Sequence, residues 1–154
     1  MKPILQALLL ADYMYEDRRT GKKVLAGIFS SLLMVKGRPK EEAADNTLAE
    51  PAETGKRPLS NVEQAGSPWV YINLTELRGR TELKLRYVSL DKHEVLFETS
   101  PISVTSQSPL DSVEMILPIP SLPRVPGVYA LELLSGDEPL GSHRITVRQM
   151  EQPK

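Results

Sequence analysis

The residues best suited to contact a ligand are Trp69, Tyr71 and Asn73, which occupy alternate positions of one short segment. The positions between them are all aliphatic, and such alternation is typical of a strand with one buried face, so these three side chains share the other face. Aromatic rings can stack on a sugar or a peptide, and an amide beside them donates and accepts hydrogen bonds. We therefore expect Trp69, Tyr71 and Asn73 to form a binding surface, unless residues 37–66 or a neighbouring strand cover them.

Residues suited to catalysis are few. The only histidines are His93, in a charged turn, and His143, at the start of the last predicted strand. No nucleophile elbow, phosphate-binding glycine loop or paired metal-ligand spacing occurs, so we predict no catalytic residue, no metal site and no cofactor. Asp12 interrupts an apolar run, and if its side chain lies inward we expect it to meet Arg18, Arg144 or a backbone donor, because a lone buried carboxylate is costly. An enzyme that uses Asp12 or His143 with a nearby serine is the alternative.

Composition describes an ordinary globular protein. The chain has 154 residues, of which 40% are hydrophobic and 25% charged, and we expect a single domain over residues 1–154. Its 19 lysines and arginines nearly balance 20 aspartates and glutamates, so we predict no nucleic-acid partner. The sequence contains no cysteine, which excludes disulfides and thiolate ligands.

The first residues raise the question of a secretion signal. Residues 3–11 form an apolar run after a single lysine, but Gln6 interrupts the run, and Asp12 and Glu16 precede any convincing cleavage site. The run is also shorter than the roughly 18 residues that a membrane-spanning helix needs. We therefore predict a buried first strand, no membrane association and a cytoplasmic location.

The elements that position these residues are strands. Residues 4–15 and 24–35 are apolar at nearly every position, as in central strands covered on both faces, although 4–15 also fits a helical spacing. From Trp69 onward, runs of period two follow one another, separated by turns. About eight strands without intervening helices predict an all-β protein, an antiparallel β-sandwich of the immunoglobulin-like or C2-like kind.

Two connecting segments stand out. Residues 37–66 contain many breakers and almost no large apolar residues, which predicts a flexible loop insertion. Four prolines between 118 and 126 indicate a sheet edge or a crossover loop. Gly127 and Tyr129 then begin a strand in a way that resembles the tyrosine corner of immunoglobulin-like domains, where the hydroxyl bonds to nearby backbone.

The overall layout resembles a bacterial family of uncharacterised proteins, the DUF6941 family. The resemblance covers nearly the whole chain except residues 37–66, and it implies a small β-sandwich without a known activity, so it supplies no site residues. The residues that carry it are Ala7, Leu8, Leu9, Leu10, Ala11, Asp12, Tyr13, Asp17, Thr20, Gly21, Lys22, Ala26, Gly27, Ile28, Phe29, Pro126, Gly127, Val128, Tyr129, Leu140, Gly141, Ser142, His143 and Arg144.

These observations support two hypotheses of function. The first is a non-enzymatic protein-interaction or structural module, whose partner is another protein or a second copy of the chain. The second is a domain that binds a small ligand or a carbohydrate through Trp69, Tyr71 and Asn73.

Overall fold

A computed structural model describes residues 2–35, 68–120, 122 and 125–150, and this part of the chain is built from strands and contains no helix. The prediction of an all-β fold is therefore confirmed, with ten strands in place of about eight. The strands are β1 (Ile4–Glu16), β2 (Lys23–Ile28), β3 (Ser31–Val35), β4 (Trp69–Thr75), β5 (Gly79–Ser89), β6 (Glu94–Glu98), β7 (Ile102–Ser106), β8 (Val113–Pro118), β9 (Gly127–Ser135) and β10 (Glu138–Met150).

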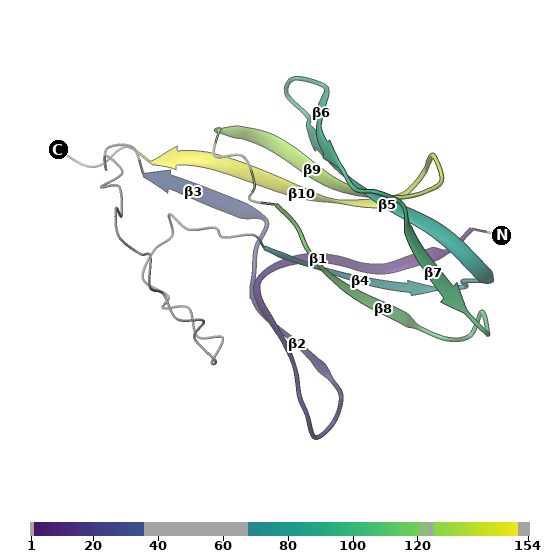
Figure 1. The fold of residues 1–154 in the computed structure, drawn as a ribbon. Coiled ribbons are helices and arrows are strands. Elements are labelled where there is room, and N and C mark those ends of the chain that lie inside the picture. Colours follow the sequence, from purple (N-terminus) through teal and green to yellow (C-terminus); the bar gives the residue numbers. More distant parts are fainter. Residues whose placement is uncertain (1, 36–67, 121, 123–124, 151–154) are drawn as a thin grey trace, which may run out of the picture.

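The strands form two sheets (Figure 1). Sheet A has the order β2-β1-β4-β8, and sheet B has the order β3-β10-β9-β5-β6, with β7 paired to the first half of β5. Every pairing is antiparallel except that of β3 with β10, which is parallel. The fold is thus a mostly antiparallel two-sheet structure of the sandwich class.

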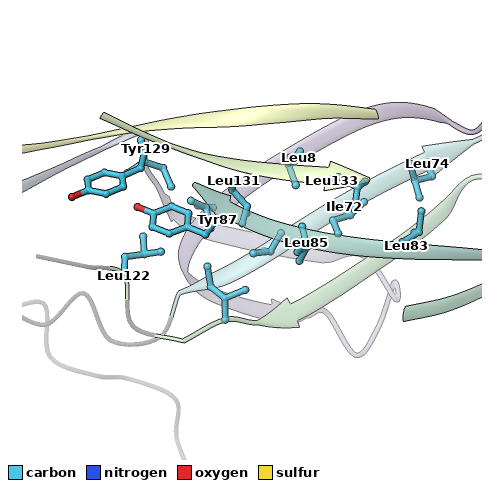
Figure 2. Close-up of a cluster of buried hydrophobic side chains, with 14 of the residues drawn as sticks. Leu8, Ile72, Leu74, Leu83, Leu85, Tyr87, Leu122, Tyr129, Leu131 and Leu133 are labelled. Carbon is cyan, nitrogen blue, oxygen red and sulfur yellow. The ribbon is translucent and has the colours of Figure 1, made fainter. Parts of the chain in front are cut away.

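The core lies between the two sheets and is aliphatic with a few aromatic rings (Figure 2). Alternate residues of each strand face inward, so that Val70, Ile72 and Leu74 of β4 are fully buried while the residues between them are not. Sheet B contributes Leu83, Leu85 and Tyr87 from β5, with Leu131 and Leu133 from β9. Burial of such side chains, at about 1.5–3 kcal/mol each, is the main source of stability in a chain without disulfides.

The second apolar run does not form the single central strand that its composition suggests. It divides into β2, which pairs with β1 in sheet A, and β3, which pairs with β10 in sheet B. The division falls at Phe29 and Ser30, two residues after Gly27, whose φ of +70° lies in the left-handed region. One apolar segment therefore contributes to both sheets, which period and composition do not reveal.

The segments around β7 and after β8 bear on the strands and loops predicted from the sequence. Residues 102–106 form β7, an alternating segment that the sequence analysis did not count as a strand. The proline-rich segment after β8 carries the chain from sheet A to sheet B, as expected for a crossover. The predicted insertion at 37–66 lies outside the described residues.

The tyrosine corner is confirmed at the start of β9. The Tyr129 hydroxyl donates a hydrogen bond to the backbone oxygen of Val125, four residues upstream, at 2.7 Å. Nearby, the carboxylate of Asp91 accepts a hydrogen bond from the Val128 amide at 2.7 Å. These bonds fix the entry of β9 into sheet B.

Candidate functional site

The three predicted binding residues lie together on the outer face of β4. Trp69, Tyr71 and Asn73 are each half-buried, and they alternate with the fully buried residues that face the core. Tyr71 lies opposite Leu9 of β1 on one side and Ile116 of β8 on the other. The outer face of sheet A therefore presents two aromatic rings bordered by aliphatic side chains.

A connected series of hydrogen bonds crosses this face. The Tyr71 hydroxyl donates to Glu114 Oε1 at 2.5 Å, and the Asn73 amide donates to the same hydroxyl at 3.4 Å. The Ser112 hydroxyl donates to the side-chain oxygen of Asn73, Oδ1, at 2.7 Å. Glu114 Oε2 accepts from Lys23 Nζ at 3.2 Å, so the series ends in an ion pair. We call Lys23, Tyr71, Asn73, Ser112 and Glu114 the outer-face network.

The charges of this network follow from its hydrogen bonds. The bonds from Tyr71 and then from Lys23 lower the pKa of the Glu114 carboxyl below its usual value, despite some burial. Burial, followed by the bond to Glu114, raises the pKa of Tyr71. At neutral pH the carboxylate is therefore ionised, and the phenol keeps its proton and acts as a donor.

Lys23 reaches Glu114 only because the β1–β2 hairpin bends back. β1 pairs with β4 as far as Ala11, and its remaining residues pair with β2 alone. Figure 1 shows this hairpin leaving the sandwich and descending beneath β8. Its path brings the first residue of β2 onto the outer face of sheet A, and Lys23 thereby joins the site.

Lys23, Ser112 and Glu114 were not predicted as site residues. Glu114 lies in β8 and pairs directly with Asn73, and Ser112 comes immediately before β8. The alternation of polar and apolar residues in this segment would therefore have identified both as outward-facing neighbours of Asn73, once β4 was assumed to pair with β8. No comparable signal marks Lys23, because its place depends on how the hairpin bends.

The other candidate residues lie elsewhere. Asp12 does not lie inward, so the condition for a buried partner is not met, and within the described part of the chain it forms no ion pair with Arg18 or Arg144. Its carboxylate instead lies against Gly27 and on the surface, and partial burial raises the pKa of Asp12. His143 Nε2 lies 3.0 Å from the backbone oxygen of Phe29, and His93 is exposed in a turn.

Among the described residues, no hydrogen bond or ion pair joins Asp12 or His143 to Tyr71 or Asn73. The described residues contain no cluster of three or more side chains suited to hold a metal ion. They also contain no helix long and apolar enough to cross a membrane. The cytoplasmic location stays a prediction.

Similarity to known proteins is found among solved structures. No protein-family model and no curated protein matches the sequence. One similar solved structure is Pseudomonas fluorescens alkylpurine DNA glycosylase AlkC bound to DNA containing an abasic site analog, with 18% sequence identity and a TM-score of 0.33. The match covers 53% of this chain and 25% of that chain, so this chain spans about a quarter of the glycosylase's length.

This match corrects two predictions from the sequence. We predicted a protein that is not an enzyme, and a protein partner or second copy with no nucleic-acid partner, whereas the matched protein is an enzyme bound to DNA. The absence of a motif argues only against the kind of site that needs this motif. Neither this absence nor a balanced net charge excludes an enzyme or a nucleic-acid partner. Both predictions are withdrawn, and a likeness at this TM-score transfers neither an activity nor a partner to this chain.

Proposed function

We propose that the outer face of sheet A binds a carbohydrate or a similar polyhydroxylated small ligand through Trp69, Tyr71 and Asn73. This is the second hypothesis from the sequence. The observation that supports it is the outer-face network, which holds an amide, a carboxylate and an ammonium group beside two half-buried rings.

The chemistry of the face suits a sugar. The apolar C–H face of a pyranose stacks on an aromatic ring, and its hydroxyl groups both donate and accept hydrogen bonds. Each oxygen of Glu114 receives one hydrogen bond from the protein and keeps a lone pair that can accept a ligand hydroxyl. Lys23 and Asn73 offer further donors, so a ligand with neighbouring hydroxyl groups would find partners of both kinds.

The network also holds its groups in place before a ligand arrives. The Asn73 amide is fixed on one side by Ser112 and on the other by Tyr71. A side chain that is already ordered loses little conformational entropy on binding. The same bonds therefore favour selective binding of a ligand whose hydroxyl groups match this arrangement of donors and acceptors.

The test is a panel of mono- and oligosaccharides screened by thermal shift. A sugar present at about 100 times its Kd should raise the melting temperature by about 5–10 °C in a protein of this size. Trp69→Ala and Asn73→Ala should each weaken the binding of that sugar, by about fivefold to tenfold for the loss of the Asn73 hydrogen bonds.

The matched control is Leu110→Ala, which removes a side chain that is 87% exposed on the loop between β7 and β8. This variant should bind the sugar like the native protein. The proposal fails if no sugar in the panel shifts the melting temperature, or if binding survives the loss of both Trp69 and Asn73.

A further inference from the structure

We propose that the β1–β2 hairpin, residues 12–27, is a strap that the Lys23–Glu114 ion pair fastens across the outer face of sheet A, and that the strap swings open about Asp12 and Gly27 when this pair breaks. This movement belongs to the chain itself and does not depend on whether the face binds a sugar.

The hairpin lacks the neighbours that hold the other strands. Among the strands that the structure describes, β1 beyond Ala11 pairs only with β2, and β2 pairs with no other strand. A two-stranded hairpin is at best marginally stable by itself in water, so contacts outside the ladder must decide where it lies. Its outward side chains include Tyr15, which is 57% exposed.

The tip of the hairpin is internally well tied. The Asp17 amide donates to the Lys22 oxygen at 2.8 Å, and the Gly21 amide donates to the Asp17 oxygen at 2.7 Å. The Asp17 carboxylate also accepts from the Arg19 amide at 2.8 Å. The tip therefore moves as one body and carries Lys23 with it.

One contact that joins this body directly to sheet A is the ion pair. Lys23 Nζ lies 3.2 Å from Glu114 Oε2, and the two side chains are 25% and 39% exposed. Tyr71 holds the other oxygen of the same carboxylate, which keeps Glu114 oriented toward the hairpin. An ion pair with this much exposure contributes little free energy, so it can open readily.

The base of the hairpin has the properties of a pivot. Gly27 has a φ of +70°, and a Cβ atom at this position would lie 2.6 Å from Asp12 Oδ2. Immediately beyond Gly27 the chain is anchored, because the Phe29 amide donates to the Leu10 oxygen at 3.1 Å and Ser30 accepts from the Thr146 amide at 2.9 Å. The hairpin thus joins a fixed segment through a kink that only glycine adopts easily.

Opening of the strap would change access to the site. Lys23 would leave Glu114, and the carboxylate and the Tyr71 hydroxyl would be exposed to water together. The strap therefore regulates how much of the outer face a ligand can reach.

The experiment measures the distance from the strap to the sandwich in the absence of any ligand. The chain has no cysteine, so Arg19→Cys at the exposed tip and Ser103→Cys on the exposed side of β7 take two spin labels without competing sites. Pulsed electron paramagnetic resonance then gives the distribution of distances between them. We expect a closed population and a minor population at longer distance.

Glu114→Gln and Lys23→Met should each raise the ratio of the long-distance to the closed population by about twofold to fivefold. Salt at 1 M should raise this ratio in the otherwise native protein, because it screens exposed charges, and should leave it unchanged in Glu114→Gln. Glu98→Gln is the matched control, since it removes a carboxylate that pairs with Lys84 and Arg86 on sheet B at 3.3 and 3.2 Å.

An unchanged distribution in both Glu114→Gln and Lys23→Met overturns the proposal, and so does an equal change in Glu98→Gln. A strap that opens as expected in a protein that binds no sugar leaves the strap established and the proposed function refuted.

Discussion

Two tyrosines stack at one end of the core, and their hydroxyl groups lie in different surroundings. The rings of Tyr87 and Tyr129 have centroids 5.4 Å apart and planes inclined by 10° (Figure 2). The Tyr129 hydroxyl donates to the Val125 oxygen, whereas the buried Tyr87 hydroxyl has no hydrogen-bond partner among the described residues. Burial and the neighbouring Tyr129 raise the pKa of Tyr87, so its phenol stays neutral.

This difference gives a prediction for two conservative changes. Tyr129→Phe should lower the free energy of unfolding by about 1 kcal/mol, because it leaves a carbonyl without its donor. Tyr87→Phe should leave stability unchanged or raise it, because it removes a buried polar group that gains no hydrogen bond. Urea denaturation of the two variants beside the native protein measures both effects.

Each tyrosine variant is the other's control, since both remove one hydroxyl and keep a stacked ring. A loss of about 1 kcal/mol in Tyr87→Phe would show that its hydroxyl has a partner after all. The sequence predicted the bond of Tyr129 through the Gly127-to-Tyr129 pattern, but nothing in it distinguished the environment of Tyr87.

At the scale of elements, prediction from the sequence was correct where the alternation of apolar and polar residues determines which face of a strand is buried. β4, with its half-buried Trp69, Tyr71 and Asn73, was placed correctly because alternation sorts residues onto two faces. The division of residues 24–35 between two sheets was missed, because apolar composition does not show where a run leaves one sheet and joins another. The place of Lys23 in the site was missed for a related reason, since the hairpin bends through tertiary contacts rather than local pattern.

The kink at Gly27 can be tested against a second glycine with a similar backbone. Gly27 and Gly21 have φ angles of +70° and +68°, but a Cβ atom meets Asp12 at Gly27 and nothing within 4 Å at Gly21. Gly21→Ala should cost about 1 kcal/mol for the left-handed conformation alone. Gly27→Ala should cost about 1 kcal/mol more, because the Asp12 side chain must also move.

Thermal and urea unfolding of the two glycine variants measure the difference. Adding Asp12→Ala to Gly27→Ala should remove most of the extra cost, because the crowded side chain is then absent. Equal costs in Gly21→Ala and Gly27→Ala would argue that Asp12 does not constrain the base of the hairpin.

At the scale of the whole molecule, both sheets share one cluster of buried side chains. The cluster joins Leu10 and Ile72 of sheet A to Leu83 and Leu131 of sheet B. Because neither sheet buries its inner face without the other, loss of a core side chain on one sheet should weaken both together. The predicted single domain implies the same behaviour, a cooperative transition in which all probes coincide.

Leu83→Ala and Leu110→Ala test this argument, because they make the same chemical change at opposite extremes of exposure. Leu83 is fully buried in the core, and Leu110 is 87% exposed on a loop. Leu83→Ala should lower the free energy of unfolding by about 2–5 kcal/mol, since it creates a cavity, whereas Leu110→Ala should change it by less than about 0.5 kcal/mol.

Trp69, the single tryptophan, reports on sheet A by fluorescence, and circular dichroism reports on both sheets. In Leu83→Ala the two signals should move to the same lower urea midpoint, because the changed residue lies on sheet B and the fluorescent one on sheet A. Separate midpoints would show that the sheets unfold independently and that the shared core does not couple them.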